Sequence, residues 1–299
     1  MINLLIFLFI ISPMIAPLRM MILAIIVLIK FEITHEYFLW AVLIAALFYF
    51  NLRSDNFVQS LLGHYEIGGG LIDFILISLL PSSLPTSGFR LGAISLAIIL
   101  LCGFGGEHRQ ELANGFLAPA AFTISPSYLP LLLASAIACR SRSATAVISF
   151  AFIMQLRSRF LKLLVLVIAI TVISLECYHR HHYISAYGAN FWNAISNSRL
   201  WQWQQLPSKA VGIDGAISRI GTVKFHNAFV DFRVISGSWL LPFWWLCLVI
   251  STYQYLPSSI LFSFIFVQFF WYNSSVILFG WFFLINKKRI FLDDYSNFY

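Results

Sequence analysis

The sequence predicts an all-α fold: a polytopic membrane bundle of about ten transmembrane helices with one polar loop on the outer face. Hydrophobic residues make up 60% of the 299 residues and charged residues only 10%, whereas a soluble domain carries roughly 25% charged residues. Apolar runs of span length alternate with short polar turns. Residues 178–237 form the one long stretch that is too polar for lipid.

That polar stretch divides the chain into three parts. Residues 1–177 are predicted to form an amino-terminal membrane bundle of about seven spans. Residues 178–237 form a large outer loop, and residues 238–299 form the carboxy-terminal transmembrane helices with a cytoplasmic tail. The expected spans are 3–29, 37–52, 67–80, 89–106, 113–139, 143–156, 160–176 and 238–254, with two short spans within 259–286.

Prolines make two of these spans irregular. The first is interrupted by Pro13 and Pro17, which predicts a kink or a split. The fifth carries three prolines, which predicts a broken or tilted helix because proline removes a backbone hydrogen bond. Residues 259–286 can be one long span or two short ones. Two short spans keep the basic clusters on either side of the polar stretch in the same compartment.

Basic residues set the predicted orientation. One cluster holds Arg157, Arg159 and Lys162, and another follows at 287–289. The positive-inside rule places both clusters, and both termini, in the cytoplasm. The polar stretch, the 81–90 loop and the 140–142 hinge then face outward. Arginines in short outer hinges run against this rule, so they either reach lipid phosphates or bind an anionic substrate.

Several classes of function find no support. The net charge of +7 is explained by basic residues at the ends of spans, and no nucleic-acid motif accompanies it. The four cysteines form no CxxC pair, so they are interpreted as packing residues. His179, His181 and His182 lack partners at ligand spacing apart from the neighbouring Glu176 and Cys177, so neither a metal nor a cofactor is expected. Asp73, inside a predicted span, is either a proton relay or a helix–helix hydrogen-bonding group.

Three stretches carry a family resemblance. They are Cys139-Arg-Ser-Arg-Ser-Ala144, Ser198-Arg-Leu-Trp-Gln-Trp203, and Phe225-His-Asn-Ala-Phe-Val230 with the later Gly237. Together they resemble the O-antigen polymerase and O-antigen ligase family of bacterial envelope proteins. The spacings from Arg199 to Gly215 and from His226 to Gly237 are similar to the polymerase branch. Leu240 stands where the ligase branch has Gly, Thr or Tyr.

The resemblance implies a multi-pass glycosyltransferase of the bacterial inner membrane. It would polymerise oligosaccharide repeat units linked to undecaprenyl diphosphate, without a metal, at the periplasmic face, in O-antigen, capsule or lipopolysaccharide synthesis. Its partners would be that lipid-linked oligosaccharide, the bilayer and a chain-length regulator protein. The alternatives are an O-antigen ligase that transfers glycan to the lipid A core, a polysaccharide or lipid transporter, and a structural subunit of an organellar membrane complex.

The resemblance also implies the site residues. Arg199 and His226 would be catalytic: the arginine stabilises charge, and the histidine, with a pKa near neutrality, guides the acceptor hydroxyl. Asn227 would support His226 or orient the sugar. Guanidinium groups would bind the departing diphosphate by charge-assisted hydrogen bonds. The residues expected to bind it are Arg142, Arg140 and Arg90.

Overall fold

A computed structural model describes residues 1–11, 16–30, 36–51, 71–80, 84–185, 206, 227–253, 257–270 and 281. Within these ranges the chain folds into helices joined by turns, and no strand occurs. The expected all-α fold is therefore confirmed for the described part of the chain. One continuous apolar core runs through it, from Ile6 near the amino terminus to Trp281.

The amino-terminal half begins with a split span. Helix α1 (Ile2–Ile11) and helix α2 (Ala16–Ile29) replace the single expected run, which agrees with the split that its prolines predict. Pro17 lies in the first turn of α2, where a missing N–H costs nothing. The next three helices are α3 (Glu36–Asn51), α5 (Leu71–Ser78) and α6 (Thr86–Leu101).

Helices α1 and α6 meet at two glycines of α6. A Cβ added to Gly88 would lie 2.2 Å from the Asn3 carbonyl oxygen, and one added to Gly92 would lie 2.8 Å from Ile10 Cδ1. Glycines four residues apart let helix backbones approach closely. The Gly88 N–H, in the first turn of α6, donates to Asn3 Oδ1 at 3.0 Å. One helix therefore supplies an acceptor for the other helix's unsatisfied amide.

The single span expected at 113–139 is wrong, because this segment folds as a hairpin. The descending arm contains α7 (Arg109–Leu112), the π-helical turn η2 (Ala113–Leu117) and α8 (Ala118–Ala120). The returning arm contains η3 (Pro126–Tyr128) and α9 (Leu129–Ala138). Each of its three prolines lies in the first turn of a short helix, so the predicted break is correct.

Two hydrogen bonds to α10 (Arg142–Gln155) fix the direction of the hairpin. Asn114 Nδ2 lies 2.9 Å from Ser141 Oγ, beside the first residue of α10. Gln155 Nε2, at the other end of α10, lies 2.8 Å from the Ala121 carbonyl oxygen. Residues 109–114 and 139–143 therefore share one end of the bundle. The orientation expected from the sequence had put the turn around Arg109 and the 140–142 hinge on opposite faces.

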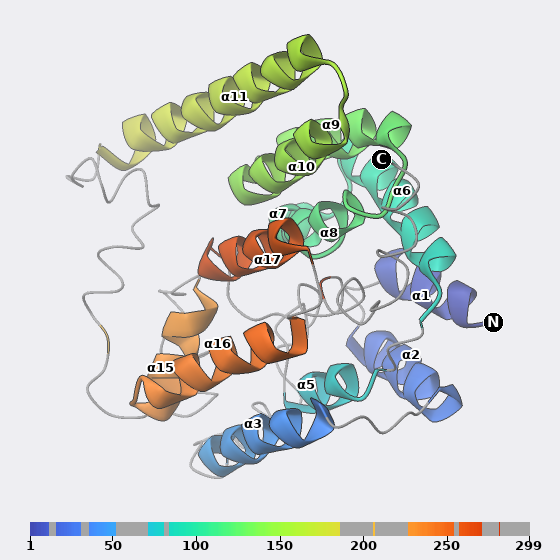
Figure 1. Ribbon diagram of the computed structural model, residues 1–299, viewed down its shortest axis with the longest axis vertical. Helices are drawn as coiled ribbons and strands as arrows, with labels where there is room; N and C mark the ends of the chain where they lie inside the picture. Colours follow the sequence, from blue (N-terminus) through green and yellow to red (C-terminus); the bar gives the residue numbers. More distant parts are fainter. Residues whose placement is uncertain are drawn as a thin grey trace.

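Helix α11 (Arg159–Ser185) is the longest described helix, with 27 residues. It packs on α10 and forms the upper edge of the bundle (Figure 1). Within the described residues, its Arg159–His179 segment is the one helix stretch long and apolar enough to cross a membrane. The shorter apolar helices, of 10–17 residues, fall below the about 20 residues that a perpendicular crossing needs. The side chains of α11 are largely exposed, with Leu163 at 59% and Leu175 at 62%.

The carboxy-terminal part contributes α15 (Ala228–Ser236), α16 (Leu240–Tyr253) and α17 (Ser258–Phe270). Helix α15 lies inside the stretch that the sequence predicts as an outer loop. Trp281 joins this part to the amino-terminal bundle: its ring lies 5.5 Å from that of Phe264 in α17 and 6.3 Å from that of Phe122.

Candidate functional site

The candidate site is the turn between α9 and α10 together with the first residues of α10, residues 139–143, which we call the α9–α10 hinge. Its backbone forms a Schellman motif. The Arg140 N–H donates to the Ile137 carbonyl at 2.8 Å, and the Ser141 N–H donates to the Ala136 carbonyl at 3.1 Å. This motif puts one residue in the left-handed region, where glycine is usual. Here that residue is Arg140, with φ 54°, the one non-glycine residue with positive φ in the described chain.

Buried hydroxyl groups alternate with arginines through the hinge. Ser141 and Ser143 are 2% and 7% exposed, whereas Arg140 is exposed and Arg142 is half-buried. Ser141 is the N-cap residue of α10, and its Oγ accepts from the Ala144 N–H at 3.3 Å. The serines therefore fix the hinge on its buried side, while Arg140 is exposed and Arg142 is half-buried against α11.

Asn114, in the π-helical turn η2, binds both hinge serines. Its Nδ2 donates to Ser141 Oγ at 2.9 Å and to the Gln110 carbonyl at 2.7 Å, and its Oδ1 accepts from Ser143 Oγ at 2.7 Å. The side chain is fully buried. Its main-chain carbonyl accepts a further hydrogen bond from Trp281 Nε1 at 3.0 Å. Single π-helical turns are frequent at functional sites.

Two arginines near the hinge, Arg142 and Arg109, donate hydrogen bonds to neighbouring segments. Arg142, the first residue of α10, donates from Nη1 to Cys177 Sγ in α11 at 3.2 Å. This contact places the hinge next to the beginning of the polar stretch. Arg109 donates from Nη2 to the Gly103 carbonyl beyond the end of α6. A cation in the first turn of a helix is disfavoured by the helix dipole, so the position of Arg142 is electrostatically costly.

Cys139 lies in the hinge but is a poor nucleophile. Burial raises the pKa of its thiol to about 11, and the nearby positive charge of Arg109 lowers it in part. Since the thiolate is the reactive form, the thiol is inert near neutral pH. Its chemistry at the hinge is therefore that of a small packing residue, as the sequence predicts.

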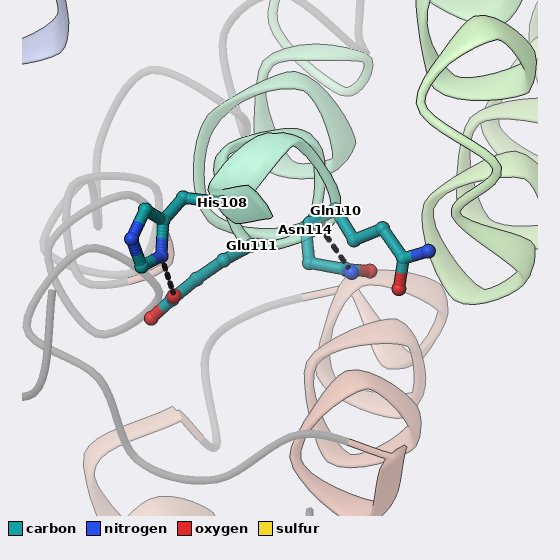
Figure 2. Close-up of polar contacts among 4 residues, drawn as sticks. All are labelled: His108, Gln110, Glu111 and Asn114. Atoms are coloured by element: carbon teal, nitrogen blue, oxygen red, sulfur yellow. Dashed lines mark hydrogen bonds and ion pairs between the residues drawn. The ribbon is translucent and has the colours of Figure 1, made fainter. Parts of the chain in front are cut away.

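His108 and Glu111 form a second polar pair on the other side of α7 from Asn114 (Figure 2). His108 Nδ1 lies 3.7 Å from Glu111 Oε2, and the two side chains are 24% and 3% exposed. A carboxylate in the first helical turn is favoured by the helix dipole. Because the pair points away from Asn114, which bonds Ser141 and Ser143, we assign it to the start of the hairpin rather than to the hinge.

The expected site residues have different outcomes. Arg140 and Arg142 lie together in the hinge, whereas Arg199 and His226 lie outside the described residues. Arg90 is near the beginning of α6 and precedes Ala97 by seven residues, which is about 10 Å along a helix. Ala97 is the residue of α6 that accepts from Ser135 of α9, at 2.9 Å. Arg109 bonds the Gly103 carbonyl, so the carboxy-terminal end of α6 faces the hinge. Arg90 lies toward the other end of α6, and the structure does not bring it together with Arg140 and Arg142.

Asn227 has a local structural role. Its Oδ1 accepts from the N–H groups of Phe229 at 2.9 Å and Val230 at 3.1 Å, which makes it the N-cap of α15. The residue is 1% exposed. The expectation that Asn227 orients His226 or a sugar has no support in these contacts, since the carboxamide oxygen is engaged by the helix.

Three residues at this end of the bundle were not expected as site residues from the sequence: Asn114, Ser143 and Arg109. The signal for Asn114 was present, since a lone carboxamide in an apolar run needs buried hydrogen-bond partners. The hydrogen-bond partners of Asn114 and the position of Arg109 could not be predicted from local sequence, because the fold of the hairpin brings both residues to the hinge.

No family model, no curated protein and no solved structure matches the chain.

Proposed function

We propose that the chain is a glycosyltransferase that polymerises undecaprenyl-diphosphate-linked oligosaccharide repeat units at the periplasmic face of a bacterial inner membrane. One observation carries this proposal. An arginine, Arg140, occupies the left-handed position of a helix cap, two residues before Arg142 in the first turn of the next helix. Strained residues persist where the surroundings hold them, and they cluster at functional sites.

The hinge has the chemistry that a diphosphate needs. Two guanidinium groups offer planar forks of N–H donors that match phosphate oxygens. The first turn of α10 adds the partial positive charge of its amides. A diphosphate that leaves during glycosyl transfer gains negative charge, and fixed donors stabilise that charge without a metal. The family resemblance supplies the remaining roles, with Arg199 as a second stabilising cation and His226 as the base.

The proposed orientation places the hinge at the outer end. Arg157 precedes α11, and Arg159 and Lys162 lie in its first turn. This basic cluster faces the cytoplasm under the positive-inside rule. The contact of Arg142 with Cys177 then lies outside. We retain about ten crossing segments: the split of the first span adds one, and the hairpin at 109–138, treated as a re-entrant unit that enters and leaves at the hinge end, removes one. Arg90 falls toward the inner end and is left out of the proposed site.

Genetic complementation tests the proposal. A strain without the gene receives wild type, Arg140→Ala, Arg142→Ala, Arg199→Ala or His226→Ala, and its lipopolysaccharide or capsule is separated on a gel. We expect a polymer ladder from wild type and a single-repeat band from each variant. Arg157→Ala removes the same charge at the opposite end of α10 and should keep the ladder.

The same gel separates the other functions. A full ladder from all four variants contradicts an enzymatic role for the hinge. Polymer that accumulates unattached on its lipid carrier indicates the ligase reaction. Repeat units that remain on the inner leaflet, measured by protection from an added glycosidase, indicate a transporter.

A further inference from the structure

We infer that Asn114 is a positioning residue for the diphosphate: its buried carboxamide sets how Arg140 and Arg142 are presented to one anionic group. This inference rests on the proposed function. The substrate class is an isoprenoid diphosphate, and Asn114 acts on it only through the hinge. Asn114 is fully buried, so the residue itself does not touch the ligand.

The hydrogen bonds of Asn114 lie on both sides of Arg142. Ser141 precedes this arginine and Ser143 follows it, and both hydroxyls bond the same carboxamide, at 2.9 Å and 2.7 Å. Both Nδ2 protons are used, the second by the Gln110 carbonyl at 2.7 Å. A carboxamide is the group that offers donors and an acceptor side by side. It can therefore hold Ser141 as an acceptor and Ser143 as a donor at the same time.

This arrangement acts on Arg140 as well. The Ser141 N–H closes the Schellman motif on the Ala136 carbonyl, while its Oγ is held by Asn114 and caps α10. Ser141 thus ties the end of α9 to the beginning of α10. Arg140, immediately before it, is kept at φ 54°. Without Asn114, the serine keeps its backbone bonds and its cap bond to the Ala144 N–H, but the costly left-handed backbone of Arg140 is held less firmly.

The support for Asn114 extends beyond the hairpin. Its carbonyl accepts from the fully buried Trp281, a residue 167 positions later. Its side chain and its main chain are thus fixed by parts of the chain that are distant in sequence. A site whose supporting shell is fixed holds its binding groups within the tolerance that recognition needs.

Binding of farnesyl diphosphate, a short isoprenoid diphosphate, to purified full-length protein in lipid nanodiscs tests this inference. The dissociation constant and the melting temperature are measured for each variant. We expect Asn114→Ala to weaken binding by about tenfold or more, since small misplacements of binding groups have large effects. Ser143→Ala should weaken it less, and the double variant should bind no worse than Asn114→Ala alone, because Ser143 acts through Asn114.

Ser135→Ala is the matched control. Ser135 is fully buried in α9 and donates to the Ala97 and Leu131 carbonyls, but its side chain has no described bond to the hinge. It should lower the melting temperature and keep the wild-type dissociation constant. If Asn114→Ala behaves as Ser135→Ala does, Asn114 is only structural and the inference is overturned.

Two further outcomes are decisive. If Asn114→Ala does not fold, wild-type binding by Ser143→Ala overturns the inference, and weakened binding supports it. If Arg140→Ala and Arg142→Ala bind the probe as tightly as wild type, or wild type does not bind it, the diphosphate site itself fails. That result removes the proposed function together with the positioning role, whereas an effect of the arginines without one of Asn114 removes only the latter.

Discussion

Helices α6 and α9 end in the same backbone motif but with different residues at its strained position. In α6 the Gly103 N–H donates to the Leu100 carbonyl at 3.1 Å and the Phe104 N–H to the Ile99 carbonyl at 3.2 Å. The end of α9 repeats both bonds, with Arg140 in the place of Gly103. A cysteine precedes the strained residue in each case.

The difference separates a cap that only ends a helix from one that also presents a charge. Glycine adopts positive φ without steric cost, whereas any other L-residue there costs about 1–2 kcal/mol. The α6 cap accepts an arginine, since Arg109 bonds the Gly103 carbonyl. The α9 cap supplies one, and the hydrogen bonds of Asn114 hold the serine that follows it. We interpret the costly residue as retained for its side chain.

Removal of Asn114, which supports the α9 cap, should have the largest effect on the stability of the protein. Asn114→Ala removes three hydrogen bonds, to the Gln110 carbonyl, Ser141 Oγ and Ser143 Oγ, and each contributes about 0.5–1.5 kcal/mol. We expect the free energy of unfolding to fall by about 2–4 kcal/mol, measured by thermal denaturation in detergent. A loss no greater than that of an exposed α11 substitution such as Leu163→Ala would contradict the buried network.

A substitution that gives the α6 cap an arginine, as in the α9 cap, should have the next largest effect on stability. Gly103→Arg puts a side chain at φ 90°, and a Cβ there meets no atom within 4 Å. The cost is therefore conformational, about 1–2 kcal/mol. Gly103→Ala should cost a similar amount, which separates backbone strain from the added charge. Equal stability of all three proteins would show that the left-handed conformation is not maintained.

The converse change should separate stability from function. Arg140→Gly relieves the left-handed strain and should raise the free energy of unfolding by about 1 kcal/mol. The same protein should lose the polymer ladder, because the guanidinium is gone. Melting temperature and the lipopolysaccharide gel are read on the same variant. Greater stability with an intact ladder would show that Arg140 has no role in activity.

The two free cysteines that precede the strained residues should show the smallest difference, which is one of thiol reactivity. Cys102 is exposed at the end of α6, whereas Cys139 is buried at the end of α9, and burial raises the pKa of its thiol to about 11. We expect N-ethylmaleimide at pH 7 to modify Cys102 and spare Cys139, followed by peptide mass spectrometry. Cys139 should become reactive in Asn114→Ala, as the hinge loosens. Equal labelling of both cysteines in wild type would contradict the buried hinge.

Local sequence was enough to predict the regular helices. The run 37–52 became Glu36–Asn51, and 143–156 became Arg142–Gln155, because apolar stretches between polar turns determine where such helices begin and end. The glycines that contact α1, Gly88 and Gly92, have G-x-x-x-G spacing, but the expectations from the sequence did not include this contact.

The hairpin and the site depend on distant contacts that local patterns do not encode. A proline predicts a break but does not say whether the chain continues across the bundle or returns. That outcome depends on pairs such as Gln155 with Ala121. The separation of Arg90 from Arg142 follows from the same fold. The left-handed backbone of Arg140 had no local signal, since the residue expected there is glycine.

The Trp281 bond to Asn114 has a consequence for the order of synthesis. The two residues are 167 positions apart, so at 5–20 residues per second a ribosome needs on the order of ten seconds or more to reach the tryptophan. During that interval the nascent hairpin lacks the donor to its π-helical turn. The hinge therefore reaches its final form only after nearly all of this sequence has been translated. An unfinished chain would hold its arginines without their last support.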